Sequence, residues 1–144
     1  MANGMRSDPF TAFRFQVEID GLIIAGFSDV SGLQAETKTY QYREGGVNNF
    51  VHKFPDCTEY PNLVLKRGLG GSDELWKWHR EVVNGRFNRK NGSVLLLDDT
   101  GQVKWRWNFS MAYPVKWVGP ELKADSNTVA FESVELVHQG IEKG

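Results

Sequence analysis

Hydrophobic and polar residues alternate with period two over residues 13–20. The apolar set is Phe13, Phe15, Val17 and Ile19, and the polar set is Arg14, Gln16, Glu18 and Asp20. Because successive side chains of a strand point to opposite faces, this pattern predicts a half-buried β-strand. The pair Asp20-Gly21 then favours a hairpin turn, since glycine accepts the positive φ that such turns need. Short returning strands are predicted at residues 22–25 and 27–30.

Further strands are predicted along the rest of the chain. The clearest alternation covers residues 103–109, where Val103, Trp105, Trp107 and Phe109 alternate with Lys104, Arg106 and Asn108. Residues 63–66, 94–97, 113–118 and 128–138 are also expected to form strands. Pro114 indicates an edge or a bulge in its strand, because proline cannot donate to a ladder.

One helix is predicted, over residues 72–85. Ser72 is placed to cap its start, and Asp73 and Glu74 suit the positive end of the helix dipole. Gly85 is placed to end it. The apolar arc of this helix consists of Leu75, Trp76, Trp78, Val82 and Val83. His79 lies in the middle of that arc, so we expect a packed, hydrogen-bonded core histidine.

Residues 34–61 have a different pattern. Residues 34–43 contain Thr and Tyr, which favour strands, yet neither face is apolar enough for a core. Such a strand either projects into solvent or pairs with another chain. Residues 44–61 have little periodicity and are interrupted by Pro55 and Pro61. Long irregular segments in compact domains are usually functional or disordered, and the aromatic residues here favour an interaction loop.

Together these elements predict a mainly β protein with one α-helix. We expect a small β-barrel or two packed antiparallel sheets, with the helix covering one opening or edge. No internal repeat or linker is visible, so residues 1–144 are expected to form a single domain. Within it we distinguish an N-terminal arm (1–11), an interaction loop (44–61) and the helix (72–85).

Composition narrows the function classes. The 144 residues are 40% hydrophobic and 24% charged, with a net charge of −1. This balance is not that of a nucleic-acid-binding protein. The lone cysteine, Cys57, excludes an internal disulfide and fits synthesis in a reducing compartment. We find neither a signal peptide nor an apolar stretch of the ~20 residues that span a bilayer. If the protein leaves its cell, we therefore expect it to do so by lysis or by a dedicated machine rather than by the secretory route.

Candidate chemical sites are sparse. His52 and Cys57 are loosely spaced like metal ligands, but a metal site needs three or four converging ligands. Asp98 and Asp99 are adjacent acids, yet they precede Thr100-Gly101 between two strands, where aspartate commonly forms turns. We predict no catalytic residues, no cofactor and no metal, and hence no enzyme.

Two alternatives remain open at this stage. The many aromatic residues can form a stacking platform in a small ligand- or sugar-binding β-barrel. A minor enzyme built on Asp98, Asp99 and a histidine is the other alternative.

Ordered sequence fragments along the chain resemble a known family. They are Asp8-Pro9-Phe10, residues 13–21, residues 26–33, residues 42–46, residues 62–68, residues 74–78, Leu97-Asp98, residues 114–117, Gly119-Pro120 and residues 135–138. Their succession, over residues 8–140, resembles the contractile-phage tail tube family. The sequence is most similar to inner tube proteins of extracellular contractile injection systems, of the antifeeding prophage and Photorhabdus virulence cassette type. Pyocin tubes and the haemolysin-coregulated protein of type VI secretion share the architecture.

This resemblance implies a structural function. It implies hexameric rings whose strands form a continuous β-barrel around a lumen, stacked helically inside a contractile sheath. It implies that sheath contraction drives the tube through a target envelope, with protein or DNA as possible lumenal cargo. The implied partners are further copies of the chain, the sheath protein, baseplate or hub proteins and tube-terminating proteins, with no membrane insertion of the subunit. The subunit is expected to be made in the bacterial cytoplasm and assembled into a phage tail or injection particle.

A loop that reaches an adjacent subunit in the family corresponds to residues 44–61. We therefore predict an intersubunit interface formed by Tyr40, Tyr42, Arg43, Glu44, Asn48, Asn49, Phe50, His52, Phe54 and Tyr60. The two-sided polar strand at 34–43 fits this picture if one face lines a wet lumen and the other meets a neighbour. Deleting residues 46–58 is expected to leave a folded monomer that does not form tubes.

Overall fold

The computed structural model describes residues 14–20, 26–42 and 51–144. In these residues, nine strands and one helix are found. Seven strands form one antiparallel sheet, and the other two form a separate hairpin. The prediction of a mainly β fold with one helix is confirmed. No helix of the described residues is long and apolar enough to span a membrane.

The strands and the helix have the following bounds. The strands are β1 (Phe15–Ile19), β2 (Phe27–Ser31), β3 (Glu36–Tyr42), β4 (His52–Glu59), β5 (Leu63–Gly68), β6 (Lys90–Leu97), β7 (Val103–Val118), β8 (Phe131–Val137) and β9 (Ile141–Lys143). The helix is α1 (Glu74–Val83).

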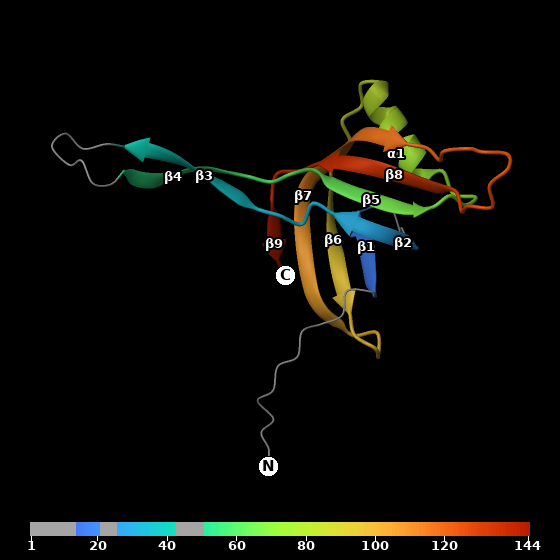
Figure 1. Ribbon diagram of the computed structural model, residues 1–144, viewed down its shortest axis with the longest axis horizontal. Helices are drawn as coiled ribbons and strands as arrows, with labels where there is room; N and C mark the ends of the chain where they lie inside the picture. Colours follow the sequence, from blue (N-terminus) through green and yellow to red (C-terminus); the bar gives the residue numbers. More distant parts are fainter. Residues whose placement is uncertain (1–13, 21–25, 43–50) are drawn as a thin grey trace, which may run out of the picture.

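The long strand β7 joins two layers of the seven-stranded sheet (Figure 1). Its first part pairs with β6 and β9, and its last part pairs with β8. Close to the junction of these parts lie Met111, with a φ of 54°, and a register shift after Pro114. A bulge increases twist and bends a strand, so one strand can serve both layers. We call β1, β6, the first part of β7 and β9 sheet A. The last part of β7 with β8, β5 and β2 is sheet B.

The core lies between the two sheets. Sheet A contributes Val17, Ile19, Val94 and Phe109, and sheet B contributes Leu63, Leu65, Val134 and Leu136. Each set occupies alternate positions of its strands, as period-two burial requires. The helix adds Leu75 and Trp78. The outward side chains of sheet A are mostly polar, so sheet A has one core face and one polar face.

Several expectations about element boundaries were wrong. The predicted strands 103–109 and 113–118 are one strand, and residues 52–59 of the predicted irregular loop form β4. Strand β6 begins at Lys90, and β9 was not predicted. The N-cap of α1 is Asp73 without a side-chain capping bond, not Ser72. Gly85 follows the end of α1 with a φ of +84°, as a residue beyond a helix end often does.

The buried histidine is His138 rather than His79. His79 is half-buried, whereas His138 is 8% exposed. Its Nδ1 accepts the Gly140 backbone N–H at 3.1 Å, so its Nε2 carries the proton and donates to the Pro61 carbonyl at 3.0 Å. The turn and strand predicted at 21–25 lie outside the described residues.

Candidate assembly interface

Strands β3 and β4 form an antiparallel hairpin that projects far from the rest of the molecule (Figure 1). All residues of β3 and nearly all of β4 are exposed. An isolated two-stranded hairpin is only marginally stable in water. A long hairpin with no second layer over it is therefore expected to need a binding partner.

Aromatic side chains gather on one face of this hairpin. Tyr40 pairs with Phe54 across the strands, and Tyr42 pairs with His52. The Phe54 ring stacks on Tyr40 with centroids 5.5 Å apart, and lies 6.4 Å from Tyr42 and 6.0 Å from His52. Tyr40 is 53% exposed, Tyr42 52% and Phe54 41%. We call these four residues the aromatic face. Exposed aromatic clusters of this kind mark protein–protein interaction sites.

The base of the hairpin is polar and well ordered by cross-strand contacts. The Thr37 and Thr58 hydroxyls lie 2.8 Å apart, and Lys38 Nζ lies 3.2 Å from a Glu59 carboxylate oxygen. The hydrogen bond and charge of Glu59 raise the pKa of Lys38. Cross-strand pairs of this kind stabilise the hairpin at its base, and a register shift between Thr37 and Thr39 separates them from the aromatic pairs.

A close backbone approach sets the point where the hairpin leaves sheet B. Gly32 has a φ of +95°, and a Cβ built on it would lie 2.1 Å from the Asn62 carbonyl oxygen. Only glycine accepts both the positive φ and this contact. The two chains entering and leaving the hairpin are therefore held against each other at its base.

The predicted interface residues fall into three groups. Tyr40, Tyr42, His52 and Phe54 lie together on the aromatic face. Tyr60 lies at the base, with its ring 5.9 Å from the ring of the buried His138. Arg43, Glu44, Asn48, Asn49 and Phe50 lie outside the described residues. The cross-strand pairing could not be read from the sequence, because β4 has no apolar alternation.

Sheet A ends in two open strands. Among the described strands, β1 pairs only with β6, and β9 pairs only with β7. The outer backbone N–H and C=O groups of such edges can pair with a strand of another chain. No sequence pattern indicated that β9 would form this second edge.

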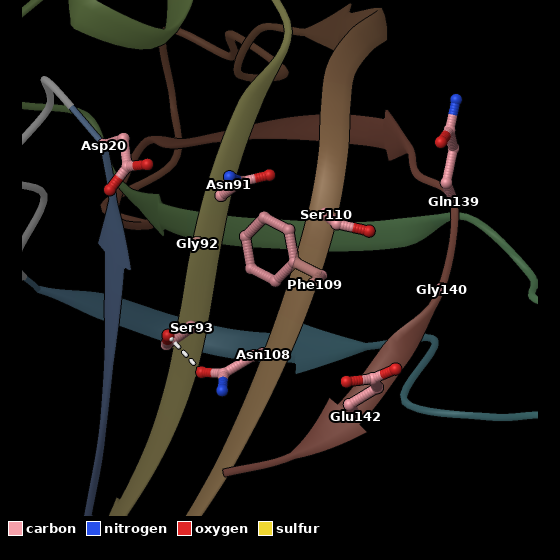
Figure 2. Close-up of a pocket in the computed structure, with 10 residues that line it drawn as sticks. All are labelled: Asp20, Asn91, Gly92, Ser93, Asn108, Phe109, Ser110, Gln139, Gly140 and Glu142. Carbon is pink, nitrogen blue, oxygen red and sulfur yellow. Dashed lines mark hydrogen bonds between the residues drawn. The ribbon is translucent and has the colours of Figure 1, made fainter.

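The polar face of sheet A carries a shallow groove (Figure 2). It has a volume of about 400 Å³. The Ser93 hydroxyl donates to Asn108 Oδ1 at 2.7 Å, and Asn91 Oδ1 accepts the Met111 backbone N–H at 3.0 Å. Asp20, Ser110, Gln139 and Glu142 complete its polar lining. Most of these side chains end in amides, hydroxyls or carboxylates, so the surface is hydrophilic and weakly acidic.

Asp98, the first acid of the Asp98-Asp99 pair, is held by hydrogen bonds within the turn after β6. Asp98 Oδ1 accepts hydrogen bonds from the Thr100 hydroxyl at 2.6 Å and from the backbone N–H groups of Thr100 and Gln102, each at 2.9 Å. These bonds, that of the Thr100 hydroxyl first, lower the pKa of Asp98 to about 2. A carboxyl so strongly ionised is a poor general acid or base near neutral pH. The described residues include no group of three or more potential metal ligands.

Comparison with known proteins agrees with an assembly function. The family model of the T4-like virus tail tube protein gp19 matches residues 11–142. A chain in the cryo-EM structure of the anti-feeding prophage baseplate has a TM-score of 0.86 and 27% identity, over 96% of this chain and 97% of that one. A chain in the extended sheath-tube complex of PVC, an extracellular contractile injection system, has a TM-score of 0.85 and 28% identity, over 94% and 91%.

A more distant structure shares the fold. Hcp1 from Flavobacterium johnsoniae has a TM-score of 0.58 and 20% identity, over 90% of this chain and 94% of that one. No curated protein sequence matches the chain significantly. These similarities confirm the expected architecture and do not favour a sugar-binding barrel. The family match covers nearly the whole chain, so this protein belongs to the T4-like virus tail tube protein family and is a tube subunit.

Proposed function

We propose that copies of this chain close into hexameric rings through the two open edges of sheet A. In this arrangement, β9 of one copy pairs with β1 of the next. The observation that carries the proposal is that each edge strand pairs on one side only among the described strands, β1 with β6 and β9 with β7. A ring satisfies both of these edges of sheet A by symmetry. The hexameric number is taken from the family resemblance.

The polar face of sheet A then surrounds the lumen. Its opposite face is buried against sheet B and the helix, so ring closure leaves the polar face to contact water. Gln16, Glu18, Ser93, Asn108 and Glu142 occupy this face on four adjacent strands. Polar side chains of this kind suit a wet channel for protein or DNA cargo. We assign the lumen to sheet A in place of the strand at 34–43, which here belongs to the projecting hairpin.

The hairpin connects neighbouring copies. Its aromatic face is exposed in the single chain, and burying three exposed aromatic side chains contributes several kcal/mol to an interface. We assign the intersubunit contact to Tyr40, Tyr42, His52 and Phe54, together with the adjoining residues 43–50. Tyr60 anchors the base of the hairpin. Residues 1–144 act as one tube domain, with residues 1–11 as an arm.

The rings stack inside a sheath that contracts and drives the tube through a target envelope. The relatives in sheath-tube, baseplate and terminating-cap assemblies support partners of these three kinds. The subunit acts structurally and not as an enzyme, without inserting into a membrane itself. It is made in the bacterial cytoplasm and leaves the cell within a phage tail or an injection particle.

A hairpin replacement tests the assembly function. Glu36 and Glu59 are Cα partners, so a short glycine-containing turn can join them in place of residues 37–58. Expressed with the other particle components, this variant should remain a folded monomer that unfolds cooperatively, with a far-UV circular dichroism signal reduced only by the strands removed, and give no tubes in electron micrographs. The unmodified chain, expressed in parallel, should give hollow tubes. Normal tubes from the shortened chain would contradict the assigned role of the hairpin.

A further inference from the structure

The core face of sheet A continues beyond the layer that covers it. Phe15, Leu96 and Trp105 are cross-strand neighbours in one row of this face. Ile19 and Phe109, farther along the same strands, are 4% and 2% exposed. The row of Phe15, Leu96 and Trp105 is half-buried, and Val103 beyond it is 46% exposed. We call these four residues the apolar strip.

Aromatic and cationic contacts characterise the rim of this strip. The Trp105 and Trp107 rings are stacked with centroids 5.5 Å apart. Lys143 Nζ lies 4.6 Å from the centroid of Trp105. The strip contains a half-buried tryptophan and an exposed valine, so the molecule's own second layer covers it only in part. Exposed apolar surface continuous with a core is typical of a docking site for another polypeptide.

The hairpin is a prolongation of sheet B, the layer that covers the core face of sheet A. Strand β2 runs into β3 through residues 32–35, and β4 runs into β5 through residues 60–62. In Figure 1, the hairpin extends past the β9 edge of sheet A, on the side away from β1. It therefore carries the second layer beyond its own molecule. Among the described elements, strands β3 and β4 make extensive contacts only with each other.

We propose that the apolar strip of one copy receives the aromatic face of the hairpin of the adjacent copy. This inference rests on the proposed ring, in which β9 of one copy meets β1 of the next. A hairpin that passes its own β9 edge then reaches the neighbour at β1, where Phe15 begins the strip. The hairpin supplies the second layer that sheet B of that neighbour does not provide. The occupant is thus a second copy of this chain.

A competing receptor lies on the outer side of sheet B. There, Val118 and Val129 border a groove of about 660 Å³. Its lining also contains the charged residues Asp29, Lys66, Glu121 and Lys123. Covering these charges with tyrosine and phenylalanine would cost desolvation, whereas the strip offers apolar and aromatic partners. The observations therefore favour the strip.

Thiol crosslinking within assembled tubes distinguishes the two receptors. Cys57 is the only cysteine, so a Cys57→Ser background removes native thiols. Tyr42→Cys is then combined with Val103→Cys for the strip, Val129→Cys for the groove or Asn108→Cys for the polar face. We expect a short bismaleimide to link the first pair into a ladder of covalent multimers, at least ten-fold above the other two pairs. Each single-cysteine variant serves as a control.

Hydroxyl-radical footprinting of the unmodified protein provides a second measurement. On assembly, labelling of Tyr42, Phe54, Val103 and Trp105 should fall several-fold, while labelling of Val129 should not. Preferential crosslinking at Val129 or Asn108, or unchanged labelling of Trp105 in tubes, would overturn the docking inference and leave the tube function intact. If the unmodified chain forms no tubes with its particle components, the proposed function itself fails.

Discussion

Arg67 and Glu132 form a buried ion pair that joins β5 to β8. Arg67 Nε donates to Glu132 Oε1 at 2.6 Å, and the two side chains are only 9% and 1% exposed. The second carboxylate oxygen accepts the Trp117 Nε1–H at 3.2 Å, and Arg67 Nη2 donates to the Ser72 carbonyl at 3.4 Å. The pair thus fixes sheet B relative to the segment that precedes the helix.

Breaking this pair should destabilise the fold strongly. Glu132→Leu leaves the buried guanidinium without its counter-charge, and we expect a loss of about 3–5 kcal/mol in the free energy of unfolding. The double variant Arg67→Met/Glu132→Leu should recover most of that loss, because it removes both charges. Urea titrations followed by tryptophan fluorescence measure both values. A double variant no more stable than the single one would contradict this account of the pair.

Alanine should destabilise the fold more at Gly32 than at Gly85, although both glycines have a positive φ. Alanine at Gly85, where a Cβ has nothing within 4 Å, should cost about 1–2 kcal/mol for its left-handed backbone alone. Alanine at Gly32 meets the same strain and the Asn62 carbonyl as well, so we expect an additional cost of about 1–3 kcal/mol. The free energies of unfolding of Gly32→Ala and Gly85→Ala are compared directly. Equal losses in the free energy of unfolding would show that the backbone at the base of the hairpin shifts easily to admit a Cβ, and would contradict the prediction.

The turn at Asp98 predicts a pH dependence of stability. The pKa of Asp98 in the fold is about 2, below the ordinary value of 3.8. The ionised carboxylate therefore stabilises the fold above about pH 4, and this contribution is lost as the pH falls toward 2. The difference in Tm between the unmodified chain and Asp98→Asn should be constant near neutral pH and shrink below pH 4. Asp99→Asn, in the same turn, is the control; an equal shrinkage there would count against the assignment.

The aromatic face should affect assembly without affecting folding. Phe54 is exposed in the single chain, so Phe54→Ser should change the free energy of unfolding by less than about 0.5 kcal/mol. In particles, the same substitution removes the centre of the proposed contact, and the yield of tubes should fall at least ten-fold. Lys53→Ser, the adjacent residue on the opposite face of β4, is the matched control. Tube yield is measured by electron microscopy. An equal reduction by both substitutions would contradict a face-specific contact.

The core of the fold could be predicted from local pattern. Strand β1 and the first part of β7 alternate between apolar and polar residues because one face of sheet A is buried. The helix followed from its apolar arc for the same reason. These patterns were sufficient to predict the elements, because burial of one face against the molecule's own core requires apolar residues at a regular spacing.

The hairpin and the long-range contacts could not be predicted in the same way. Strand β4 has no buried face in the single chain, so nothing imposes a period on its sequence. The pairing of Arg67 with Glu132 depends on the register of strands that lie far apart in sequence. His138 had a usable signal, because it continues the alternation of Val134 and Leu136 on the buried face of β8. The apolar arc of the helix, in which His79 lies, instead predicted His79 as the core histidine.

A cryo-EM reconstruction of the assembled tube, at a resolution that traces individual strands, tests the central claim most directly. The account predicts a ring in which β9 of each copy is hydrogen-bonded to β1 of the next and the polar face of sheet A lines a hollow centre. Copies that contact one another through other surfaces, with β1 and β9 both unpaired in the tube, would contradict it.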